Sequence, residues 1–366
     1  MSRPTRTLIL VGALYAIAVV LISARKGNSL EPHLQIANQL LDGTPVYDRA
    51  PNYGTWWPPG ALALIAPFAL VARASVPLAK ALFAVFGVVC LVWALARAPA
   101  GRWTVAALAL AAVAKPVQTD FETLNLNVVL LALVIATWRD LETGRDVRAG
   151  VWLGIAAALK IFPALLIVYA ALRGRWRAAA WGAGVALALT VGPLVPRGGE
   201  GMRATLVDWV RLTRSGTAAL RGHSQSLSAL VDRSGAPRAA GIAASLALIA
   251  WAAWWLRRRR PLFTELALVT HVAVLATPFV WTQNFVLLFP TWVAILAAPL
   301  PRPALPPRWR RAVLIPIGFV TSGVVAAWSQ PVRNAWYAAA AHTWGALAAL
   351  AVLGLTPPLG DEQQAV

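Results

Sequence analysis

Residues 150–172 read GVWLGIAAALKIFPALLIVYAAL, an apolar run that carries a single charge, Lys160. A run of about 20 apolar residues is long enough to cross a bilayer as a helix. Similar runs recur along the 366 residues, of which 59% are hydrophobic and 13% are charged. Soluble domains have about 25% charged residues. The pattern therefore excludes a soluble enzyme, a disordered chain and a secreted disulfide scaffold, and it predicts an all-α polytopic membrane protein.

We predict about twelve membrane-spanning helices of roughly 20 residues each, in one integral membrane domain over residues 1–366. The spans are expected at 7–24, 57–71, 76–96, 103–117, 124–138, 150–172, 178–195, 239–256, 262–280, 285–300, 312–328 and 335–355. The runs that begin at Trp57 and Trp103 are short, so partial or re-entrant helices are an alternative there. Residues 7–300 form the expected core, spans 312–355 are peripheral, and 356–366 form a short polar tail.

Two connections, residues 25–56 and 196–238, are too long to be simple turns. Each contains a stretch with helical periodicity, at 31–41 and 202–213. Amphipathic helices of this kind lie in the plane of the membrane interface. We therefore expect two long external loops that carry interfacial helices.

The net charge of +19 raises the possibility of nucleic-acid binding. The basic residues are instead scattered in short clusters between apolar stretches, such as Arg257–Arg260, which is typical of loops that anchor at lipid headgroups. A nucleic-acid partner is therefore not expected. The arginine clusters favour an N-terminus on the cytoplasmic side, with both long loops outside and with Asp120 and Glu122 inside.

Few side chains are available for catalysis, because the chain has only 14 Asp and Glu and 4 His. No HExxH, paired CxxC, GxSxG or GxxxxGK[ST] motif occurs. Zinc hydrolases, serine hydrolases and P-loop enzymes are thus excluded at the level of motifs, and we expect neither a metal nor a cofactor. The nearest approach to an acidic metal pair is Asp120-Phe121-Glu122, which we interpret as a polar turn.

Lys160 is the most informative single residue, because it lies ten residues or more from either end of its apolar run. A charge at the centre of a membrane helix costs about 2.5–3.5 kcal/mol on insertion scales, so it usually faces a cavity or a partner. An anionic phosphate is a natural partner. The alternative is a lysine that snorkels to the membrane surface.

Other candidates lie near the ends of the predicted spans. Trp56 and Trp57 form a rigid aromatic entry before two prolines, either as the wall of a sugar or lipid site or as an interface anchor. Polar groups at span ends suit a pocket for a hydroxyl-rich ligand. They are Asn127, His223, Gln225, Trp281, Gln283 and Asn284.

Four stretches of the chain resemble the motifs of glycosyltransferase family 87, polyprenyl-phosphate-sugar-dependent enzymes of the GT-C class that include α-1,2-mannosyltransferases. The third of these stretches is the most specific. The stretches are LLDGTPVY at 40–47, NLN at 125–127, GIAAALKIFP at 154–163 followed by RGRWR at 173–177, and TPFVWTQN at 277–284.

The resemblance implies a GT-C fold in the inner membrane of a bacterium, with the active site on the extracytoplasmic face. It implies transfer of mannose or a related sugar from a polyprenyl-phosphate donor to a hydroxyl of a glycan or glycolipid acceptor. Lys160 would bind the donor phosphate. An acidic residue in the first loop would act as general base.

The chain departs from the family pattern where that base is expected. Ser29-Leu30 stands in place of the family's Asp-Phe, and His33 stands in place of a tyrosine. Glu31 is therefore our first candidate for the base, Asp48 the second and His33 the third. A lipid or solute transporter, including a flippase, and a GT-C-like assembly partner without activity are the alternative functions.

Overall fold

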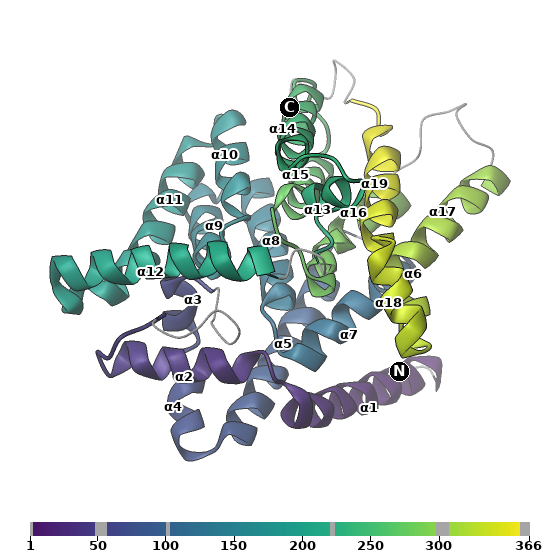
Figure 1. The fold of residues 1–366 in the computed structure, drawn as a ribbon. Helices are drawn as coiled ribbons and strands as arrows, with labels where there is room; N and C mark the ends of the chain where they lie inside the picture. Colours follow the sequence, from purple (N-terminus) through teal and green to yellow (C-terminus); the bar gives the residue numbers. More distant parts are fainter. Residues whose placement is uncertain (1–2, 48–56, 100–102, 220–223, 298–306, 359–366) are drawn as a thin grey trace.

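The computed structural model describes residues 3–47, 57–99, 103–219, 224–297 and 307–358, without the side chains of 3–12, 216–219 and 307–310. The described residues form helices and no strand, which confirms the predicted all-α class (Figure 1). In chain order the elements are α1 (Arg3–Lys26), α2 (Leu30–Leu41), α3 (Pro59–Leu64), α4 (Ala66–Ala74), α5 (Val76–Arg97), α6 (Trp103–Ala111), α7 (Ala114–Thr123), α8 (Asn127–Glu142), α9 (Asp146–Leu159), α10 (Ala164–Leu172), α11 (Trp176–Val191), η1 (Gly192–Arg197), α12 (Gly198–Ala219), α13 (Leu227–Arg233), α14 (Arg238–Trp255), α15 (Leu262–Ala276), η3 (Thr282–Leu288), α16 (Phe289–Ala297), α17 (Pro307–Ser322), η4 (Val324–Ala327), α18 (Gln330–Ala338) and α19 (Ala341–Gly354).

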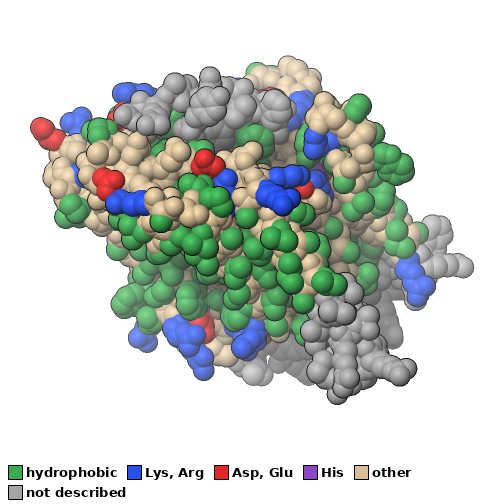
Figure 2. All heavy atoms as spheres, turned by 90° about the horizontal axis from the view of Figure 1, so that it is seen from below, with side chains coloured by type: hydrophobic (Ala, Val, Ile, Leu, Met, Phe, Trp, Pro, Cys, Tyr) green, Lys and Arg blue, Asp and Glu red, His purple; other side chains and the backbone are tan. Residues whose placement is uncertain are grey.

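The molecular surface has the distribution of a membrane protein. Figure 2 shows a band of hydrophobic side chains with lysines and arginines along both of its edges. Within the described part of the chain, three helices are long and apolar enough to cross a bilayer, at Val76–Arg97, Trp176–Ser215 and Arg238–Trp255, and the bent pair α18 and α19 would make a fourth. The count of about twelve spans stays a prediction.

Residues 150–172 do not form the single span that the sequence predicts. Helix α9 ends at Leu159, and α10 begins only at Ala164. Arg175, which follows α10, lies 3.3 Å from Asp146 at the start of α9. The chain therefore reverses its direction at residues 160–163. Pro163 contributes to the break because it has no backbone N–H to continue the helical hydrogen bonds.

The expected spans at 57–71 and 103–117 are broken as well. The first consists of the short helices α3 and α4, which meet at Ile65. The second consists of α6 and the first turn of α7, and α7 then continues to Thr123. The alternative of partial helices at these two places agrees with the structure.

Close packing of α9 against α11 fixes the position of the reversal. A Cβ atom on Gly154 would lie 2.5 Å from the Cβ of Val185, and one on Gly150 would lie 2.5 Å from the carbonyl oxygen of Ala178. Only glycine permits this approach of the two backbones. The C-terminal end of α9, just before Lys160, also packs on α3, where a Cβ on Gly60 would lie 3.0 Å from the Cβ of Ala158.

Candidate active site

Lys160 lies in the turn between α9 and α10, with extended backbone, rather than in the middle of a helix. Its Nζ donates to Asn127 Oδ1 at 2.8 Å and approaches Asn284 Oδ1 at 3.5 Å. These partners come from the start of α8 and from η3, so the turn gathers groups that are far apart in sequence. An ammonium has three N–H donors, and the described residues accept at most two of them. The remaining donor is available to a ligand.

Asp120 determines how Asn127 faces Lys160. The Asp120 carboxylate accepts from Asn127 Nδ2 at 2.7 Å and from the backbone N–H groups of Asn127 and Val128 at 3.3 and 3.1 Å. An ionised carboxylate only accepts hydrogen bonds. The Asn127 amide nitrogen therefore faces Asp120, and its oxygen faces Lys160. Both Asp120 and Asn127 are fully buried.

The prediction that Asp120 lies on the opposite side from the first loop is wrong. Helix α7 ends beside the end of α1, where Ser23 Oγ donates to the Phe121 carbonyl oxygen at 2.8 Å. Asp120 also caps the N-terminus of α8 by accepting hydrogen bonds from its backbone N–H groups. This is a more specific role than the polar turn that we expected from the sequence. The error follows from the break between α6 and α7, because a span that ends at 117 leaves Asp120 in a separate loop.

His33 is the residue of the first loop that lies close enough to Lys160 to feel its charge. Its ring packs against the Trp57 indole with centroids 3.8 Å apart, and its Nδ1 bonds to the carbonyl oxygen of Ser29. Burial lowers the pKa of His33 to about 3, and the nearby charge of Lys160 acts in the same direction. His33 is therefore neutral at physiological pH.

Tyr47 holds Trp57 in place. The Tyr47 hydroxyl donates to the Trp57 carbonyl oxygen at 2.8 Å, and both side chains are buried. Tyr47 belongs to the LLDGTPVY stretch, but the residue pattern by itself does not assign it this role. Trp57 of the predicted aromatic entry thus contacts His33 and accepts a hydrogen bond from Tyr47.

The remaining predicted residues divide into those near Lys160 and those used for packing. Asn284 reaches Lys160, and its neighbour Gln283 is buried in η3. Gln225 is bound on three sides, by the Val280 and Tyr337 carbonyl oxygens and by the Thr343 hydroxyl, so it ties the second long loop to the bundle. The Trp281 indole packs on Phe279, with ring centroids 5.0 Å apart.

The candidate bases are less closely tied to Lys160. Glu31 pairs with Lys80 on α5 at 2.8 Å, and its side chain is 43% exposed. It lies two residues before His33 on α2, and side chains at that spacing do not face each other on a helix. Asp48, Trp56 and His223 lie outside the described residues. No group of three or more metal-binding side chains occurs among the residues that the structure describes.

The sequence model of glycosyltransferase family 87 matches residues 56–278, more than half of the chain. The chain belongs to glycosyltransferase family 87. The match contains Asp120, Asn127 and Lys160, and it supports a membrane glycosyltransferase that acts on a sugar donor and an acceptor. No curated relative and no solved structure matches the chain.

Proposed function

We propose that this family 87 glycosyltransferase moves mannose or a related sugar from a polyprenyl-phosphate donor to a hydroxyl of a glycan or glycolipid. We further propose that it acts on the extracytoplasmic face of a bacterial inner membrane. The observation that carries the proposal is the Lys160 ammonium in the turn between α9 and α10, with one N–H donor left available by its protein partners.

Lys160 would contact the phosphate of the donor. When the bond between the anomeric carbon and the phosphate oxygen breaks, the oxygen keeps the electron pair and the polyprenyl phosphate gains negative charge. A fixed cation beside that oxygen stabilises the charge as it develops. The hydrogen bond from Lys160 to Asn127, at 2.8 Å, keeps the ammonium in position before the donor binds.

The acceptor hydroxyl would attack the anomeric carbon and give its proton to a carboxylate. Asp120 is not suited to this step, since its oxygens already accept three hydrogen bonds from Asn127 and Val128. Asp120 is thus a positioning residue. Glu31, with its partly exposed carboxylate, is our first choice for the base and Asp48 our second.

His33 and Trp57 would line the sugar side of the site. The stacked pair offers an apolar face and a neutral imidazole, and aromatic faces are suited to the apolar faces of sugar rings. Gln283 and Asn284 would add amide groups for sugar hydroxyls.

Transfer of labelled sugar from a polyprenyl-phosphate donor in proteoliposomes tests the proposal. Lys160→Gln should lower kcat/KM by roughly tenfold or more, because charge-assisted hydrogen bonds contribute about 1.5–3 kcal/mol. Lys26→Gln, an exposed lysine in the last turn of α1, is the matched control and should keep full activity. Full activity of Lys160→Gln would refute the phosphate contact.

The assignment of the base is tested separately. Glu31→Gln should abolish transfer while the donor still binds. If Glu31→Gln and Asp48→Asn both retain full activity, neither carboxylate is the base. A purified protein that binds polyprenyl phosphate but transfers no sugar would instead favour the inactive assembly partner, which the serine at position 29 makes a specific alternative.

A further inference from the structure

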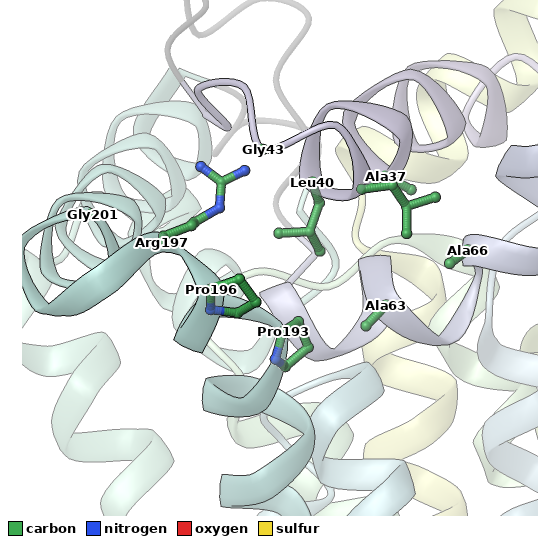
Figure 3. A pocket seen from close by; sticks show the side chains of 10 residues that line it. Ala37, Leu40, Gly43, Ala63, Ala66, Pro193, Pro196, Arg197 and Gly201 are labelled. Carbon is green, nitrogen blue, oxygen red and sulfur yellow. The ribbon is translucent and has the colours of Figure 1, made fainter.

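A cavity of about 490 Å³ lies between the two long loops, separate from the residues around Lys160. It is bounded by α2, α3, the start of α4, η1 and the start of α12 (Figure 3). The volume is within the range of about 300–1,000 Å³ that is usual for small-molecule sites. The lining consists of Ala37, Leu40, Leu41, Gly43, Ala63, Ala66, Pro193, Pro196, Arg197 and Gly201.

The side chains of the lining suit a hydrocarbon. Apart from Arg197, all of its side chains are apolar or absent. Pro193 and Pro196 also remove two backbone N–H donors from the wall, since proline has none. A hydrocarbon chain that enters such a cavity gains about 0.8 kcal/mol for each CH₂ group buried.

Arg197 is the single charge of the cavity. Its Nη2 donates to the carbonyl oxygens of Thr44 at 2.7 Å and of Gln39 at 3.4 Å, whereas its Nη1 donates to none of the described residues. None of the ion pairs among the described residues includes Arg197. A guanidinium with a free Nη1 can donate a charge-assisted hydrogen bond to a phosphate.

The cavity also lies where a bilayer lipid can reach it. Figure 1 shows α12 lying steeply across the direction of α10 and α11, with α2 and α3 below it. Leu41 at the mouth is 47% exposed, and Val195 in the adjoining η1 is 65% exposed. Exposed apolar side chains on elements that cross a bundle end are typical of the membrane interface.

Helix α2 contributes residues both to the candidate site, through His33, and to the cavity, through Ala37. Ala37 follows His33 by four residues and therefore shares its face of the helix, about 6 Å along the axis. A polyprenyl-phosphate sugar has one phosphate. If that phosphate is at Lys160, the anion at Arg197 belongs to a second molecule.

We infer that this cavity binds one anionic phospholipid of the bilayer, with its phosphate at Arg197 and a hydrocarbon chain against Pro193, Pro196 and Ala63. The occupant is distinct from the sugar donor. That the occupant is distinct from the donor rests on the proposed function, whereas binding of the phospholipid does not require sugar transfer.

Native mass spectrometry of the purified full chain tests the inference. Palmitoyl-oleoyl phosphatidylglycerol and palmitoyl-oleoyl phosphatidylcholine, which have the same chains, are added at equal concentration. The wild type should retain one phosphatidylglycerol with a preference of about tenfold, because the choline cation of phosphatidylcholine repels the Arg197 guanidinium whereas phosphatidylglycerol carries only the negative phosphate. Arg197→Gln should lose the preference, while Arg203→Gln, an exposed arginine of α12, should keep it.

Variants that fill the cavity with larger side chains provide a second test by the same measurement. Ala63→Leu combined with Ala66→Leu should remove the bound lipid, whereas Ala74→Leu, on the exposed face of α4, should not. Polyprenyl phosphate, added last, should bind beside phosphatidylglycerol. Unchanged preference in Arg197→Gln, unchanged lipid in the filled variant, or one-for-one displacement of phosphatidylglycerol by polyprenyl phosphate would each overturn the inference. The comparison of Arg197→Gln with Arg203→Gln still tests the inference if the filled variant does not fold.

Discussion

Replacement of Asp120 by asparagine would break the orientation of Asn127 without changing the size of the side chain. The carboxylate accepts three hydrogen bonds, the shortest at 2.7 Å from Asn127 Nδ2. An asparagine at 120 has one acceptor oxygen, and its NH₂ group would face at least one donor. Its oxygen can keep the two contacts with Asn127 only if its NH₂ faces the Val128 N–H, and this repulsion loosens the start of α8, where Asn127 holds Lys160 at 2.8 Å.

The magnitude follows from these contacts. Hydrogen bonds to a charged group contribute about 1.5–3 kcal/mol, and loss of a good helix N-cap costs about 0.5–2 kcal/mol. Asp120→Asn should therefore destabilise the fold by about 2–4 kcal/mol, since the two effects share atoms and do not add fully. The KM for the donor should rise by roughly tenfold, because the Lys160 ammonium is no longer held toward its phosphate.

Thermal unfolding in detergent and initial rates over a range of donor concentrations measure the two effects. Asp208→Asn, which removes an exposed ion pair with Arg211, is the matched control and should change neither. The exchange variant Asp120→Asn with Asn127→Asp restores a donor–acceptor pair and leaves an acceptor for Lys160, so it should recover part of the loss. If Asp120→Asn alone keeps the wild-type KM, the orienting role of Asp120 is refuted. The same holds if the exchange variant recovers neither the KM nor the stability lost in Asp120→Asn.

Two further predictions concern the scaffold. Gly154→Ala should destabilise the fold by about 1–3 kcal/mol through overpacking, because the new Cβ would meet Val185. Gly184→Ala, on the same pair of helices, places its Cβ in open space and should be tolerated. The thermal unfolding midpoints of the two variants compare them directly. Glu265→Gln should cost about 3–5 kcal/mol because it leaves the partly buried Arg173 without its carboxylate, and a midpoint equal to that of the wild type would contradict this reading of the pair.

The membrane class and the need of Lys160 for a polar partner were predictable from residue types. Long apolar runs require a non-aqueous surrounding whatever their packing, and a lone lysine among them requires a partner. The family motifs around residues 154–163 are equally local, and the match over 56–278 agrees with them. None of these features depends on which helices are neighbours.

The direction of each helix was not predictable in the same way. Hydropathy cannot tell a continuous span from two short helices that reverse, because both have the same composition. The reversal at Lys160 depends on the approach of Gly150 and Gly154 to α11, which is a contact between segments about 30 residues apart. Hydropathy did not predict the breaks at Ile65 and between α6 and α7 for the same reason.

By itself, the sequence determined an all-α membrane protein with the motifs of a glycosyltransferase family and one lysine that requires a partner. Only the tertiary structure decided that Asp120 and Asn127 hold that lysine, that His33 of the first loop stacks on Trp57, and that Arg197 lines a separate cavity with mainly apolar side chains. The physical reason is the separation along the chain over which each interaction acts. Apolar transfer is set residue by residue along the chain, whereas a buried polar group is satisfied by whichever distant segment the packing brings to it.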